Sequence, residues 1–287
     1  MLQWTIGEVT VSSVTEMYDI PIPGPVFIPA ATPDAVLAVD WLRPRFADEA
    51  GNLLLRIQAL VVESRGRRIV VDTCLGNDKP RTNAFFDGLQ TTFLDDLTDA
   101  GFGPGTVDAV VCTHLHVDHI GWNTMLRDGE WRPTFPNARY YLSRADVEHW
   151  STTPSADGDL FGDSVRPIID AGQADLVEPP FAVTDEVVLE PTPGHSPGHM
   201  SVRIRSGGAE AVITGDVMHH PVQCARPSWY SSFDSDAAHA ERTRREFLAA
   251  HADRDILVLG THFADPVAGY VVRDGDAFRF VTRGQAN

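Results

Sequence analysis

The chain has 287 residues, of which 43% are hydrophobic and 22% charged, and its formal net charge is −17. This length and apolar content suffice for a sizeable core. The acidic surplus argues against nucleic acid or an anionic membrane as a partner, because both are bound through clustered Lys and Arg. The N-terminal stretch MLQWTIGEVTVSS has no basic segment followed by a long apolar run. We therefore expect a cytoplasmic protein that does not enter membranes.

The first half of the chain predicts strands and helices in alternation. Residues 19–51 carry six prolines among apolar residues, which predicts an ordered loop lying over a surface and makes the segment a candidate lid or homodimer contact. Apolar runs at 53–64 and 67–73 predict two strands joined at Gly66, and a helix is expected over 92–101. Further strands are expected at 106–113 and 138–143, the latter running into a helix, and another helix at 161–172.

The second half repeats this pattern. Strands are predicted at 187–192, 200–206 and 209–216, a helix at 236–251, and a strand at 255–262 followed by a hairpin about Gly275. No shift in composition marks a linker, so residues 1–287 are expected to form a single domain of the α/β class.

Several predicted strands end in a side chain that can bind a metal ion. The run DAVVCTH reaches His114, EAVITGD reaches Asp216, and DILVLGTH reaches His262, while RIVVD reaches Asp72. Apolar strands of this kind are buried on both faces, and functional groups in such sheets collect beyond the carboxyl ends of the strands. The sequence therefore predicts that these side chains converge in space.

The stretch CTHLHVDHIGWN at 112–123 crowds coordinating side chains together, and imidazole with carboxylate suits zinc and similar divalent ions. We expect two ions that share one carboxylate, which leaves each site open for catalysis. The expected ligands are His114, His116 and His195 for one ion, Asp118, His119 and His262 for the other, and Asp216 as the bridge.

Five motifs in order along the chain resemble those of the metallo-β-lactamase superfamily. They are THLHVDH at 113–119, PGH at 193–195, TGD at 214–216, GTH at 260–262 and, earlier, VDT at 71–73. The resemblance implies a sandwich of two mixed β-sheets flanked by helices, with a dinuclear metal site along one edge. It also implies two divalent metal ions, zinc first, with manganese, iron or cobalt as alternatives. By the same resemblance Asp72 braces the cluster loop and is not a ligand.

Within this superfamily the chain resembles hydrolases of small molecules. TPGHSPGH is similar to the N-acyl-homoserine lactonase group, whereas the layout of residues 215–236 looks more like the methyl parathion hydrolase group. Lactonases of the quorum-quenching type place a tyrosine three positions after the bridging aspartate, where this chain has His219. The resemblance thus favours an ester or lactone substrate, with phosphotriesters or thioesters as alternative substrates. The other alternative is that the protein is not a hydrolase but a metal-dependent redox or binding protein.

The expected reaction is hydrolysis in which a hydroxide held between the two ions attacks a carbonyl carbon. Asp118 is the expected proton relay to the leaving group, and His219 is a second candidate catalytic residue. His199 is expected to support the turn that carries His195. Candidate aromatic walls for a substrate pocket are Phe85, Phe86, Trp122, Trp229 and Tyr230.

Overall fold

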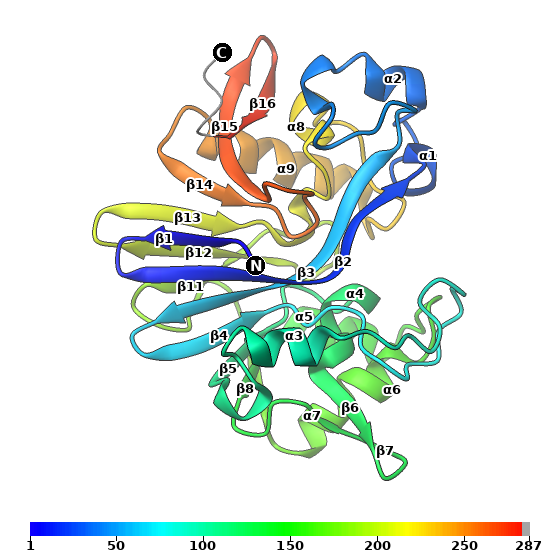
Figure 1. Ribbon diagram of the computed structural model, residues 1–287, viewed down its shortest axis with the longest axis vertical. Coiled ribbons are helices and arrows are strands. Elements are labelled where there is room, and N and C mark those ends of the chain that lie inside the picture. The colour runs from blue at the N-terminus through cyan, green and yellow to red at the C-terminus, as the bar shows by residue number, and fades with distance from the viewer. Residues whose placement is uncertain (283–287) are drawn as a thin grey trace.

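Two seven-stranded sheets packed face to face form the centre of the protein in a computed structural model that describes residues 1–282 (Figure 1). The first sheet has the order β1-β2-β3-β4-β5-β8-β9, and the second runs β10 to β16 in sequence order. The first sheet consists of β1 (Gln3–Ile6), β2 (Val9–Ile22), β3 (Leu53–Ser64), β4 (Arg67–Val71), β5 (Ala109–Val111), β8 (Arg139–Ser143) and β9 (Ala174–Val177). The second consists of β10 (Phe181–Ala182), β11 (Val187–Pro191), β12 (Met200–Ser206), β13 (Ala209–Ile213), β14 (Ile256–Leu259), β15 (Ala268–Asp274) and β16 (Ala277–Val281).

Both sheets are mixed, and their parallel pairs place the functional edge. The pairs β4–β5, β5–β8, β8–β9 and β13–β14 are parallel, whereas the other pairs are antiparallel. Parallel neighbours end at the same edge of a sheet, so the loops that follow β4 and β5, and those that follow β13 and β14, emerge together.

Helices cover the outer face of each sheet, which completes the expected four-layer sandwich (Figure 1). One side carries α3 (Phe93–Asp99), α5 (Arg144–Trp150), α6 (Leu160–Ser164) and α7 (Arg166–Asp170) over the first sheet. The other carries α8 (Val222–Ala225) and α9 (Ala237–His251) over the second. A separate hairpin is formed by β6 (Thr124–Arg127) and β7 (Glu130–Pro133).

Apolar side chains fill three layers, and β3 shows how one strand serves two of them. Leu60 and Val62 lie in the layer between the sheets, whereas Ala59 and Val61 face the helices on the other side. Alternate residues of a strand point to opposite faces, so the apolar run ALVV at 59–62 is the pattern of a strand buried on both. The predicted strand at 53–64 coincides with β3 for this reason.

The single helix predicted over 161–172 is wrong, because the chain forms α6 and α7 with a break at Val165. Pro167 lacks the N–H that would bond to the carbonyl of Asp163 in a continuous helix. That carbonyl instead accepts hydrogen bonds from Lys79 Nζ and Thr124 Oγ1. The bonds from outside the helix replace the missing backbone donor.

The proline-rich segment is ordered, but the expectation of a loop over 19–51 is wrong. Its first four residues belong to β2, and it then forms α1 (Gly24–Phe27), α2 (Pro33–Leu37) and the short 3-10 helix η1 (Asp40–Leu42). Ile28, Leu42 and Phe46 are buried in the same core layer as α9. The segment therefore covers this chain's own second half. Among residues 1–282, no helix has the length and apolar character needed to cross a bilayer.

Candidate metal centre

The structure brings all seven predicted ligands together at one edge of the sandwich. The first sheet supplies the loop after β5 and the short helix α4 (Val117–Ile120), and the second supplies three loops. The residues lie after β5 (His114 and His116), in α4 (Asp118 and His119), between β11 and β12 (His195), after β13 (Asp216) and after β14 (His262).

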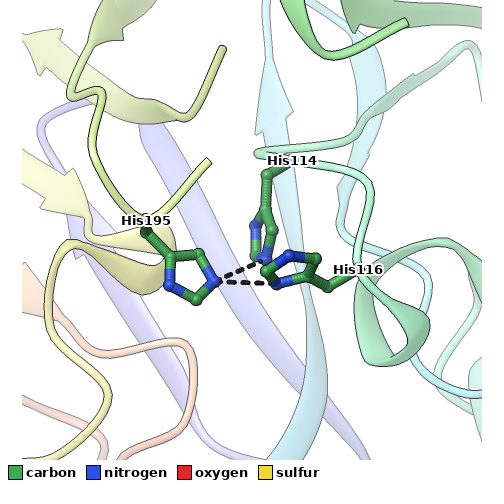
Figure 2. A group of neighbouring side chains, drawn as sticks. All are labelled: His114, His116 and His195. Atoms are coloured by element: carbon green, nitrogen blue, oxygen red, sulfur yellow. Dashed lines mark hydrogen bonds between the residues drawn. The ribbon is translucent and has the colours of Figure 1, made fainter. Parts of the chain in front are cut away.

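A first group is formed by three histidines whose ring nitrogens point at one another (Figure 2). His195 Nε2 lies 3.1 Å from His114 Nε2 and 2.9 Å from His116 Nδ1. His114 and His195 are buried, whereas His116 is partly exposed. Three imidazoles at such distances can coordinate one cation between them.

A second group is formed by Asp118, His119 and His262. His119 Nε2 lies 3.1 Å from His262 Nε2, and the carboxylate of Asp118 lies 3.6 Å from the former and 3.5 Å from the latter. The side chain of Asp118 is 22% exposed, whereas that of His119 is fully buried. Asp118 is therefore the member of this group that a substrate can reach from solvent.

Asp216 lies between the two groups. Its Oδ2 is 3.3 Å from His195 Nε2 and 3.4 Å from His119 Nε2, and its Oδ1 is 3.2 Å from His262 Nε2. Oδ1 is buried, and within residues 1–282 it has no hydrogen-bond partner. A buried carboxylate oxygen without a partner is costly, so this atom fits a bound cation.

The outward-facing ring nitrogens show that these residues fit metal ions. His119 Nδ1 bonds to Asp72 at 2.9 Å, His195 Nδ1 to Asp234 at 2.9 Å, and His262 Nδ1 to the carbonyl of Arg56 at 2.9 Å. Because these oxygens accept, each Nδ1 carries the proton and each Nε2 lone pair faces the centre. Lone pairs that face one another at 3.1 Å repel unless a cation or a proton lies between them.

The charges at the site favour a cation as well. Burial lowers the pKa of His114 and His195 well below the usual value, which keeps both imidazoles neutral and able to coordinate. Burial also acts to lower the pKa of His262, but Asp216 and Asp118 together raise that pKa to about 9. The carboxylate thus attracts protons onto its neighbours. A divalent cation supplies the same positive charge, so its binding releases protons.

Asp72 behaves as the resemblance implied, since it braces the cluster loop from behind. Besides His119 it accepts the backbone N–H of Thr113 at 2.7 Å, and it does not reach the converging nitrogens. Asp234 plays the matching part for His195. Asp234 could not be predicted from the sequence, because it is 39 residues from its partner and stands in no recognisable motif.

His199 is a structural residue, as expected: its ring lies 5.9 Å from that of His195, and its ring nitrogens bond to the backbone on either side. Its Nδ1 donates to the carbonyl of Thr192 at 3.0 Å, and its Nε2 accepts the backbone N–H of Asp216 at 2.7 Å. Gly215 allows this close approach, since it has a φ of +53° and a Cβ there would lie 2.5 Å from His199 Nε2. His199 therefore fixes the backbone that carries the shared carboxylate.

His219 lies against the ligand cluster. Its Nε2 is 3.3 Å from Asp216 Oδ2 without hydrogen-bond geometry, and neither ring nitrogen has a partner within the described part of the chain. Its ring meets Phe27 edge-on at 5.1 Å and lies 4.7 Å from the ring of His195. His219 can therefore contact a molecule bound at the centre. Phe27 is an aromatic neighbour of His219 that the sequence did not indicate.

The candidate aromatic residues for a substrate pocket differ in how far they are buried. Trp122 is a core residue, because it stacks on Phe93 and donates to Glu16 at 2.7 Å, so this candidate does not wall a pocket. Phe86 and Trp229 are partly buried against the core. Phe85 and Tyr230 are exposed.

Comparison with known proteins agrees with this geometry. The profile of the metallo-beta-lactamase superfamily matches residues 54–262. An N-acyl homoserine lactonase of Bacillus cereus is 25% identical over 66% of this chain and 74% of its own length. A probable metallo-hydrolase of Mycobacterium tuberculosis is 24% identical over 78% of this chain and 79% of its own. The dizinc quorum-quenching lactonase AidC has a TM-score of 0.81 at 21% identity, covering 100% of this chain and 98% of its own. With this fold, these motifs in order and this cluster of ligands, the chain belongs to the metallo-beta-lactamase superfamily.

Proposed function

We propose that this hydrolase cleaves small esters or lactones with two divalent cations, zinc first, held at the candidate metal centre. The observation that carries the proposal is the position of Asp216, whose oxygens reach nitrogens of both ligand groups. In this assignment His114, His116 and His195 hold one cation, and Asp118, His119 and His262 hold the other. The bound pair would supply an acidified water as nucleophile and a Lewis acid for the carbonyl oxygen.

The chain's own residues then have separate tasks. Asp72 and Asp234 hold His119 and His195 in the tautomer that directs Nε2 inward. Asp118 is more exposed than Asp216, at 22% against 5%, and its carboxylate can pass a proton to the leaving alkoxide. His219 borders the same space and can hydrogen-bond the substrate oxygen on which negative charge develops.

The lactone or ester preference is supported by the relatives, several of which are N-acyl homoserine lactonases. The ligands act on the attacked centre whatever group leaves, so phosphotriesters and thioesters are alternatives at the same site. His219 in place of the lactonase tyrosine and the layout of residues 215–236 favour phosphotriesters among these.

A substrate panel tests the proposal directly. Zinc-loaded protein is expected to hydrolyse γ-lactones and aryl acetates faster than paraoxon-type phosphotriesters or S-lactoylglutathione, because the centre is assigned to carbonyl attack on an oxygen ester. The measurement is kcat/KM for each compound at equal metal loading. Higher kcat/KM for the phosphotriester would replace the proposed substrate class, and no turnover of any compound would discard hydrolysis.

His219 is expected to act on the substrate and not as a required ligand. His219→Phe keeps a ring against Phe27 but removes both ring nitrogens. Turnover should fall about 100-fold, the lower range for loss of one hydrogen-bond donor to a developing oxyanion, with metal content unchanged. Metal content by atomic emission and kcat on the best panel substrate check this. A variant that loses one equivalent of metal would show instead that His219 is a ligand.

A further inference from the structure

A buried carboxylate outside the ligand set joins the two loops of the first group. Asp146 lies in the first turn of α5 and is fully buried. Its Oδ2 accepts a hydrogen bond from Ser196 Oγ at 2.8 Å, and its Oδ1 accepts one from the backbone N–H of Gly198 at 2.6 Å. A hydrogen bond from the backbone N–H of Leu115 also acts to lower the pKa of this carboxylate.

These three donors come from the segments that carry the first ligand group. Ser196 follows His195 directly, and Leu115 lies between His114 and His116. His114 and His195 are 81 residues apart in sequence and come from opposite sheets, so nothing local fixes their spacing. The carboxylate of Asp146 is the shared acceptor on which both segments rest.

The turn after His195 is seated tightly on α5. A Cβ at Gly198 would overlap the hydroxyl of Ser143 and lie 2.9 Å from Asp146 Oδ1, so only glycine permits this approach. The other end of α5 carries Trp150, whose ring centre lies 5.4 Å from that of His116. One helix thus contacts the residues on both sides of the first group.

A charged carboxylate at the buried position of Asp146 costs free energy of desolvation. Burial raises the pKa of Asp146, and the hydrogen bonds from Ser196 and Gly198 oppose that shift. Apolar packing would fill the same space without the cost of desolvating a carboxylate. Apolar side chains, however, cannot accept hydrogen bonds from two separate loops at fixed positions.

We propose that Asp146 is a positioning residue that sets the spacing between His195 and the His114–His116 loop, and thereby the affinity of the first group for its cation. This inference rests on the proposed function, since it takes that group as a metal site. Residues that orient ligands typically change metal affinity by about 10 to 100-fold when replaced. The second group does not touch Asp146, so its affinity is expected to stay the same.

The test is titration of metal-free protein with cobalt and with zinc, followed by calorimetry and by the visible spectrum of bound cobalt. In Asp146→Ala one of two binding steps should weaken about 10 to 100-fold, and the cobalt bands of that step alone should change. Asp146→Asn should lose less, because an amide oxygen still accepts from Gly198. Ser196→Ala removes only the bond to Oδ2 and serves if Asp146→Ala does not fold.

Glu186→Gln is the matched control. Glu186 is also a buried carboxylate, 5% exposed, that accepts bonds from two hydroxyls, Ser64 Oγ at 2.8 Å and Ser206 Oγ at 2.7 Å, away from the metal centre. Both binding steps should match the parent protein in this variant.

Equal weakening of both steps in the Asp146 variants, or of neither, would overturn the positioning role while leaving the hydrolase proposal intact. A parent protein that binds fewer than two cations would overturn the dinuclear proposal itself, and this inference with it.

Discussion

Asp216→Asn should leave a folded protein with reduced metal content and turnover lowered by at least about 100-fold, the upper end of the cost of losing a residue that only supports a ligand. Asp216 is the carboxylate that reaches both ligand groups, and an amide in its place is neutral and turns N–H donors toward ring nitrogens. Circular dichroism, metal content by atomic emission and kcat on the best lactone or ester measure the three parts of this result.

The control is again Glu186→Gln, which removes a buried carboxylate charge without touching the metal centre. It should retain full metal content and turnover. If Asp216→Asn were as active as the parent, two cations sharing this carboxylate would not be the basis of catalysis.

Removal of the cations by a chelator is expected to abolish turnover and to lower the free energy of unfolding. Without cations, only protons on the imidazoles offset the carboxylates of Asp118 and Asp216, as the raised pKa of His262 shows. Zinc at about 100 times its Kd should restore about 2.7 kcal/mol, because it binds the folded state. Urea unfolding with and without zinc measures the difference.

Zinc, manganese and cobalt are each expected to restore activity to the chelated protein, since imidazole and carboxylate ligands accept all three. Activity that survives complete metal removal would contradict the assignment. Iron found in the purified protein, together with a visible absorption band, would point to redox chemistry at the same residues.

The strand ends and the ligands that follow them were predictable from the sequence for a common reason. β5 and the end of β13 are short apolar runs without polar alternation, which is the pattern of strands buried on both faces. Once such strands share an edge, the polar residues after them converge. This pattern alone was enough to predict the positions of His114 and Asp216.

The residues behind the ligands were not predictable in the same way. Asp146 and Asp234 stand in sequences that would suit any exposed helix or turn, and their partners are 50 and 39 residues away. His199 sits in a motif that pointed to His195, yet it bonds to the backbone of Asp216. Such contacts depend on how loops from two sheets meet, which periodicity and local propensity do not encode.

The early part of the chain shows a different limit. β2 pairs with β3 through two register shifts between Thr15 and Ile20, so its strand pattern is interrupted just where the prolines begin. Bulges break the alternation by which strands are recognised. The sequence pattern at the end of β2 therefore predicted a loop.

Each ligand group draws on both sheets, and this has a consequence for how the protein comes apart. Neither half of the chain can assemble a complete cation site, so the site exists only after the halves have docked. Interactions that form only after the folding transition state act on the rate of unfolding. Bound cations would then hold the two halves together and prolong the lifetime of the native state, with little effect on the rate of folding.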